Sequence, residues 1–373
     1  MSLKNKIVKS KYSHPVTSVL HFSYLALIFV VASVSPGKAE NAPPIPLEKS
    51  QQAQQSIADL KLLAERGESE AQAKLGIAFE HGQGIQQDFS QAASWYQKAA
   101  AQGDAIAQNN LGKLYSTGEG VHRNAQVAAD LYQKSAEQGN ALAQANLAKA
   151  YFRGEGVTKN YPLALEWYKK SAEQGNALAQ ASLGYAYEVG EGVPADMPIA
   201  VNWYQKASQG GDTMAQTNLA RLYYTGQGVP QDLNEAVKWY LSAANTGNAL
   251  AQSAIGAIYE TGTGLPRDLG KAADWYEKAA EQGVTVAAGN LAKMYFNGAG
   301  RGQDDHGAVH WWKVAAEQKD AESQYNLGLM YFSGRGVEQD YEQAAHWWKE
   351  AAALGYAKAS TKLEQIKSMG LIK

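Results

Sequence analysis

The sequence contains no cysteine, which excludes disulfide bridges, thiolate nucleophiles and cysteine metal sites. It also lacks dense positive charge, because 34 basic and 36 acidic residues give a net charge of −2 and no dense basic run occurs outside the N-terminus. Nucleic acid is therefore not an expected partner. Neither a nucleophile–base pair nor a pair of carboxylates stands out, so we expect no catalytic residue, no cofactor and no metal.

The sequence does contain a repeat with a fixed period of 36 residues. Counted from an Ala-Gln pair, the copies start at Ala71, Ala107, Ala143, Ala179, Ala215, Ala251, Ala287 and Ser323. A strict period in this range is typical of stacked supersecondary units, none of which buries its apolar face alone. The predicted fold is all-α: a right-handed α-solenoid of eight 36-residue helix-turn-helix repeats with capping helices.

The third copy illustrates the predicted unit. A first helix over residues 143–152 carries apolar residues at helical spacing, and Gly154 and Gly156 end it. Asn160 is placed to cap a second helix, in which Trp167 and Tyr168 begin an aromatic stripe. Such a stripe at helical spacing predicts a hydrophobic core rather than a ligand site.

The two ends of the chain differ from the repeats. Residues 1–39 combine four early lysines, an apolar stretch and Gly37-Lys38-Ala39, which is typical of a secretory signal peptide. An uncleaved membrane anchor is the alternative. We predict a flexible linker over 40–55, an N-terminal capping helix over 56–70, eight repeats over 71–358 and a C-terminal capping helix over 359–373. The expected location is periplasmic or secreted.

The repeated pattern A-Q-x-N-L-G-x-x-Y-x-x-G-x-G-V, followed by D, A, W-Y, A-A and G, closely resembles the bacterial Sel-1-like repeat, a relative of the tetratricopeptide repeat. The resemblance implies a monomeric, non-catalytic adaptor of the cell envelope that binds a protein or peptide in its concave groove. One branch of the family implies an alternative, the binding or hydrolysis of β-lactams or peptidoglycan fragments. That branch has a disulfide in each repeat, which this sequence cannot form.

The candidate binding residues lie on the face of the first helix that the core leaves free. Asparagine recurs just before the Leu-Gly pair, and lysine or arginine recurs three residues later. Amides can bond an extended peptide backbone, and basic side chains can pair with carboxylates. A solvated polar face is the alternative explanation. The predicted binding residues are Asn110, Lys113, Asn146, Lys149, Arg153, Asn218, Arg221, Asn290, Lys293 and Asn326.

Two His-Trp-Trp sequences lie one repeat apart, with His310 and His346 in front of the tryptophans. Helices packed about 10 Å apart would hold the two imidazoles too far from each other to share a metal ion. We therefore predict that these tryptophans replace the Trp-Tyr core pair and that the histidines bind no metal.

Overall fold

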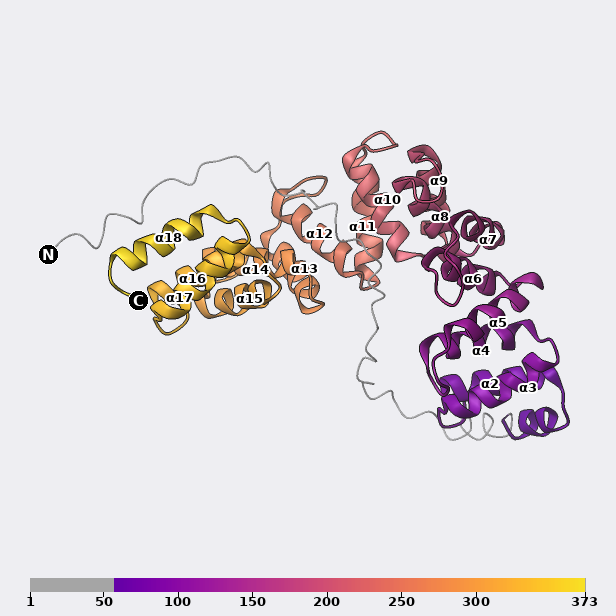
Figure 1. Cartoon of the computed structure of the whole chain (residues 1–373). Helices are drawn as coiled ribbons and strands as arrows, with labels where there is room; N and C mark the ends of the chain where they lie inside the picture. Colours follow the sequence, from indigo (N-terminus) through magenta and orange to yellow (C-terminus); the bar gives the residue numbers. More distant parts are fainter. Residues whose placement is uncertain (1–56, 373) are drawn as a thin grey trace, which may run out of the picture. The chain divides into compact units, whose positions relative to one another are not determined.

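The computed structural model describes residues 57–372, and within this range it contains helices joined by turns and no strand (Figure 1). Each repeat supplies an even-numbered first helix and an odd-numbered second helix. The first helices are α2 (Ser69–His81), α4 (Ala105–Thr117), α6 (Ala141–Arg153), α8 (Ala177–Val189), α10 (Thr213–Thr225), α12 (Ala249–Thr261), α14 (Thr285–Asn297) and α16 (Ala321–Ser333). The second helices are α3 (Phe89–Ala101), α5 (Ala125–Glu137), α7 (Tyr161–Glu173), α9 (Met197–Gln209), α11 (Leu233–Asn245), α13 (Leu269–Glu281), α15 (Asp305–Glu317) and α17 (Tyr341–Ala353), and α18 (Ala357–Ser368) follows.

Every helix packs against the next one along the chain, so the predicted all-α solenoid is confirmed. The turn inside each repeat is also as predicted. In the third repeat Gly154 ends α6 with a φ of 73°, a left-handed conformation that glycine adopts at no steric cost. Asn160 then caps α7, since its Oδ1 accepts from the backbone N–H of Leu163 at 3.1 Å.

The start of the first helix differs from the prediction by two residues. α6 begins at Ala141 rather than at Ala143, because Asn140 caps it by accepting from the backbone N–H of Ala143 at 3.0 Å. Five other first helices have the same kind of cap, and it was not recognised in the sequence. The capping residues are Asp104, Asn176, Asp212, Asn248 and Asp320.

The second aromatic residue of each pair lies in the core. All eight of these side chains are buried: Tyr96, Tyr132, Tyr168, Tyr204, Tyr240, Tyr276, Trp312 and Trp348. In five repeats the ring rests directly on a glycine of the first helix. A Cβ on Gly184, for example, would lie 2.7 Å from Cδ1 of Tyr204. The first aromatic is mostly half-buried, and in five repeats a lysine ammonium lies over it, as Lys98 does over Trp95 at 3.8 Å.

Glutamine side chains link one repeat to the next. Gln174 donates to Oε1 of Gln144 at 2.8 Å, and Gln144 donates to the carbonyl of Ala136 at 3.2 Å. The same Gln–Gln bond joins residues 30 apart at three further junctions. This ladder gives the glutamine of the repeated Ala-Gln pair a structural role, because it fixes the register of successive repeats.

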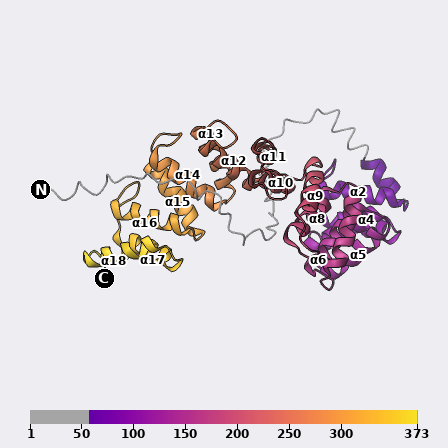
Figure 2. The same cartoon turned by 90° about the horizontal axis from the view of Figure 1, so that it is seen from above.

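The ends of the array carry extra helical residues. Residues 57–65 are helical and pack on α2 through Ala64 and Leu75, and the chain turns at Gly67, where φ is 97°. This helix is shorter than the predicted 56–70, since Ser69 already belongs to α2. At the other end α18 covers α17 over Ala357–Ser368 rather than 359–373 (Figures 1 and 2).

The predicted signal peptide (1–39) and linker (40–55) lie outside the described residues. Within residues 57–372, every helix is too short or too polar to cross a bilayer.

Candidate functional site

The first helices present one face that carries all the predicted binding residues. On α6 this face contains Leu142, Asn146, Lys149 and Arg153, which fall within about 60° of one another around the helix. Leu142 is exposed and the other three are half-buried. We call the surface formed by these four positions in all the first helices the first-helix face.

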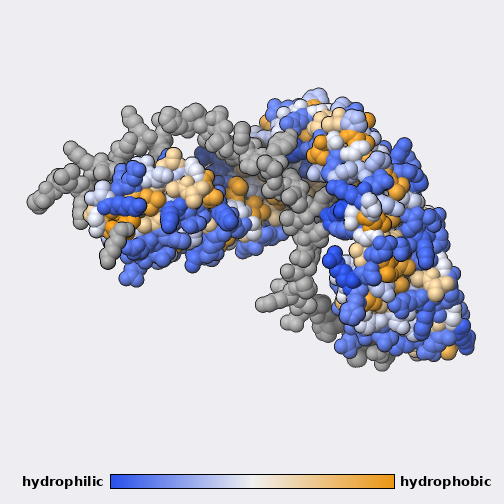
Figure 3. All heavy atoms as spheres, in the orientation of Figure 1, coloured by the Kyte–Doolittle hydropathy of each residue, from blue (hydrophilic) through white to orange (hydrophobic). Residues whose placement is uncertain are grey.

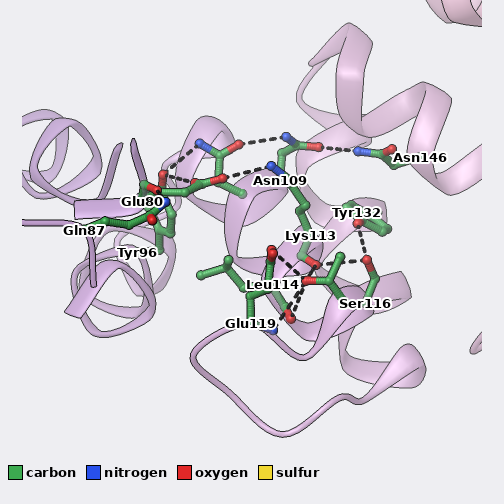
Figure 4. A network of polar contacts seen from close by, with 12 residues as sticks. Glu80, Gln87, Tyr96, Asn109, Lys113, Leu114, Ser116, Glu119, Tyr132 and Asn146 are labelled. Carbon is green, nitrogen blue, oxygen red and sulfur yellow. Dashed lines mark hydrogen bonds and ion pairs between the residues drawn. The ribbon is translucent and has the colours of Figure 1, made fainter. Parts of the chain in front are cut away.

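The structure brings two of the predicted asparagines into one hydrogen-bonded chain (Figure 4). Asn110 donates to the hydroxyl of Tyr96 at 3.3 Å and accepts from Asn109 at 3.0 Å. Asn146 of the next repeat donates to Oδ1 of Asn109 at 3.0 Å. Asn109 is buried and was not among the predicted binding residues. The chain crosses the junction between the first helices of repeats two and three.

Three other predicted asparagines occupy the same half-buried position further along the array. Asn218 lies on α10, Asn290 on α14 and Asn326 on α16. Asn290 also bonds the hydroxyl of Tyr276. The asparagine line is therefore partly engaged within the protein.

Several of the predicted basic side chains already hold an internal carboxylate. Lys113 Nζ lies 2.9 Å from Oε1 of Glu80, which belongs to the preceding repeat. Arg221 pairs with Glu188 in the same way, again 33 residues apart. Lys293 instead pairs with Glu322 of the following repeat at 2.7 Å.

The glutamates of these pairs are further anchored by the core tyrosines. Tyr96 donates to Glu80 at 2.6 Å, and Tyr204 donates to Glu188 at 2.7 Å. Burial and the neighbouring Glu80 carboxylate together raise the pKa of the Tyr96 phenol well above its usual value. Burial alone would raise the pKa of Glu80, but the bonds from Tyr96 and Lys113 outweigh it and leave that pKa lowered.

Lys149 differs from Lys113 and Arg221 because its counterpart in the preceding repeat is not an acid. The equivalent of Glu80 there is Ser116, whose Oγ lies 3.4 Å from the Tyr132 hydroxyl. Within residues 57–372, Lys149 makes no hydrogen bond or ion pair, although Arg153 and Glu155 lie near enough to act on its charge. Burial, and then the charge of Arg153, lower the pKa of its ammonium group. Arg153 itself lies 3.5 Å from Glu155.

An exposed apolar row on the same face was not predicted. It occupies the position of Leu142 in six consecutive repeats, and its side chains are 37–63% exposed. Figure 3 shows that one face of the molecule is largely hydrophilic and carries scattered apolar patches, in orange. The sequence signal was present, since an apolar residue is flanked by small residues near the start of these first helices. The apolar row consists of Ile106, Leu142, Leu178, Met214, Leu250 and Val286.

The His-Trp-Trp sequences lie outside this face, on α15 and α17. Trp312 and Trp348 are buried as predicted, whereas the exposed His310 packs edge-on against Trp311 with ring centroids 4.9 Å apart. His346 does the same at 5.1 Å. Across the described residues, His, Asp and Glu side chains form no group of three or more that could hold a metal ion.

Comparison with known proteins places these features in a family. The Sel1 repeat model matches eight consecutive segments, residues 69–104, 105–140, 141–176, 177–212, 213–248, 249–284, 285–320 and 321–356. None of the curated proteins compared with the chain matches it.

Two solved structures share both sequence and fold with the chain. One is c5321, a protective antigen of uropathogenic Escherichia coli strains that displays an SLR fold, with 35% identity over 86% of this chain and 76% of that one and a TM-score of 0.62. The other is a Sel1 repeat protein from Oxalobacter formigenes, with 28% identity over 88% of this chain and 98% of that one and a TM-score of 0.60.

Proposed function

This chain belongs to the Sel1 repeat family, and we propose that it is a non-catalytic scaffold that binds a protein or peptide partner through its first-helix face. Sel1 repeat proteins generally mediate protein–protein interactions. The observation that carries the proposal is the repeated combination, on one face, of exposed apolar side chains with half-buried amides and cations. A partner needs this mixture of apolar contact and oriented polar groups.

The internal hydrogen bonds leave capacity for a partner. A lysine ammonium has three donors and a guanidinium has five, so an internal carboxylate does not exhaust either group. Lys113 remains half-exposed while bound to Glu80. The ten predicted residues lie on α4, α6, α10, α14 and α16, on the same face as the apolar row, and we expect them to border a concave groove.

We also propose that the protein is exported to the periplasm or beyond, on the strength of residues 1–39 alone. The mass of the N-terminal peptide from the native protein tests this proposal. A chain that starts at Glu40 supports export with cleavage, whereas retention of Met1 would indicate the tethered alternative.

Capture of a partner from native envelope extract tests the scaffold. The full-length protein is produced with a C-terminal affinity tag. The first-helix variant combines Asn146→Ala with Lys149→Ala. We avoid Lys113 and Arg221 because their loss would strand Glu80 and Glu188. The control variant, Lys134→Ala with Lys169→Ala, changes exposed residues of the second helices α5 and α7.

We expect the wild type and the control to retain the same protein and the first-helix variant to lose at least nine-tenths of it, about a tenfold weakening. A partner that all three proteins retain equally would move the site away from this face. If the wild type retains no protein at all, the scaffold proposal fails.

A further inference from the structure

Repeat three contains a cation, Lys149, that forms no direct ion pair with an acid among residues 57–372. Where a first-helix cation meets the preceding repeat, Lys113 finds Glu80 and Arg221 finds Glu188. Lys149 occupies the same position, yet the preceding repeat offers it the hydroxyl of Ser116. Glu155 acts on Lys149 only at a distance and lies 3.5 Å from Arg153 instead. A half-buried ammonium without a bonded acid is electrostatically incomplete, since burial weakens its hydration and no direct ion pair replaces it.

The apolar row lies on the same helix face as this cation. Leu142 is 59% exposed and lies two helical turns from Lys149 on the same face of α6. Single exposed aliphatic residues are ordinary on protein surfaces, but six of them at one repeated position need an explanation. At one junction the row abuts the next repeat, because Met214 Sδ lies 3.7 Å from Nδ2 of Asn248, the cap of α12.

Charged residues close the apolar row at both of its ends. The same position is Glu70 in the first repeat and Glu322 in the last. Glu70 pairs with Lys74 at 2.6 Å, and Glu322 pairs with Lys293 at 2.7 Å. The apolar contact surface is thereby confined to repeats two to seven, and at its ends the charges are neutralised within the chain.

We propose that α4, α6 and α8 bind an acidic segment of a partner protein. Its carboxylate occupies on Lys149 the place that Glu80 occupies on Lys113, and its apolar side chains pack on Ile106, Leu142 and Leu178. This inference rests on the proposed scaffold function and specifies the chemistry of its partner.

Charge decides between an acidic segment and other apolar occupants. An apolar segment without an acid would displace water from the Lys149 ammonium without forming an ion pair with it. Such desolvation of a cation is unfavourable. A basic segment would add to the repulsion that Arg153 already exerts on Lys149. A carboxylate instead forms charge-assisted hydrogen bonds with the ammonium and relieves that repulsion.

The substitution Ser116→Glu tests the proposal without removing any group. It recreates beside Lys149 the arrangement in which Glu80 holds Lys113 and Tyr96, because Tyr132 already lies within reach of residue 116. The introduced carboxylate should occupy Lys149 from within the chain and exclude the partner's acid. The thermal unfolding midpoint is expected to be equal to or above that of the wild type, so loss of binding cannot be attributed to misfolding. Ser94→Glu, on the exposed side of α3, is the matched control.

The probe is a phage-displayed library of random linear peptides, selected on the tagged full-length protein. We expect the enriched peptides to combine Asp or Glu with large apolar residues. The affinity of the best of them should fall at least tenfold in Ser116→Glu and in Lys149→Gln, weaken in Leu142→Ser, and stay unchanged in Ser94→Glu.

Three results would overturn the inference: enriched peptides without an acidic residue, equal affinity for Ser116→Glu and the wild type, or no enrichment at all. None of these decides the scaffold function, because a protein captured from extract through the first-helix face would still establish it. Retention of a second copy of this chain in that experiment would identify the occupant as the protein itself and contradict a separate acidic partner.

Discussion

Glu80 Oε1 and Lys113 Nζ lie 2.9 Å apart although 33 residues separate them, so this ion pair joins the first two repeats of the array. The Glu80 carboxylate is only slightly accessible and also accepts from Tyr96. In a repeat array each unit contacts only its neighbours, so a polar link of this kind contributes to the interface term between units. Loss of the ion pair should therefore destabilise the first two repeats rather than the whole chain.

Glu80→Gln is expected to destabilise the N-terminal repeats at pH 7 by about 1–3 kcal/mol, because a neutral amide loses the charge-assisted bond to Lys113. The folded state lowers the pKa of Glu80, so its contribution is present above the ordinary value of 4.5 and is lost as the pH falls through the lower folded-state pKa. Urea unfolding of the variant and wild type should therefore differ at pH 7 and converge near pH 3.

The control for this experiment is Glu338→Gln, an exposed glutamate in the turn after α16. It should leave stability unchanged at both pH values. If Glu80→Gln lowers the free energy of unfolding equally at pH 7 and pH 3, then the shape of the Glu80 side chain, and not its charge, stabilises the repeats.

The pair formed by Glu188 and Arg221 should couple more strongly than a surface pair. Both side chains are largely shielded from solvent, and Tyr204 also binds the carboxylate. A double-mutant cycle with Glu188→Gln and Arg221→Gln should give a coupling of about 0.5–3 kcal/mol. The same cycle on Glu235 and Lys238, which are far more exposed, should give about 0.3 kcal/mol. Equal couplings would contradict a special role for the inter-repeat pair.

Much of the fold could be predicted from the sequence because each unit carries its own stop and start signals. The glycines after α6 and the cap at Asn160 could each be predicted from the residue type alone. The start of α6 was misplaced by two residues because the repeat was counted from the Ala-Gln pair at Ala143, whereas the cap, Asn140, lies three residues before it.

The candidate site was only partly predictable, since its chemistry depends on which residues of adjacent repeats meet. The basic residues were visible as a row, but Glu80 lies a whole repeat from Lys113, and their pairing appears only when α2 and α4 are packed. The apolar row was missed for a different reason. Leu142 follows the helical spacing of the core residue Ala145, and only the packing shows that one is exposed and the other buried.

Gly184→Ala is expected to destabilise the fourth repeat by about 1–3 kcal/mol, because its Cβ would meet the Tyr204 ring at 2.7 Å. Moving the ring would also weaken its bond to Glu188. The sequence of the third repeat supports this link. Ala148 stands there at the position of Gly184, and Phe152 stands at the position of Glu188. The reverse change, Ala148→Gly, should cost only about 0.5–1 kcal/mol through helix propensity. Thermal unfolding of both variants measures the difference, and equal costs would mean that the ring shifts freely.

Lys149 should lose its proton at a lower pH than freely hydrated lysines, because burial and then the charge of Arg153 lower its pKa. NMR of the reductively ¹³C-methylated protein measures this titration, and the Lys149→Arg variant assigns the signal by its disappearance. Ser116→Glu should move the titration upward, since a carboxylate placed beside the ammonium favours its charged form. The opposite result is that Lys149 titrates at the same pH as the other lysines and that Ser116→Glu does not change this pH. Water would then already compensate the charge of Lys149. An acidic partner would then gain no advantage over a neutral one at this position.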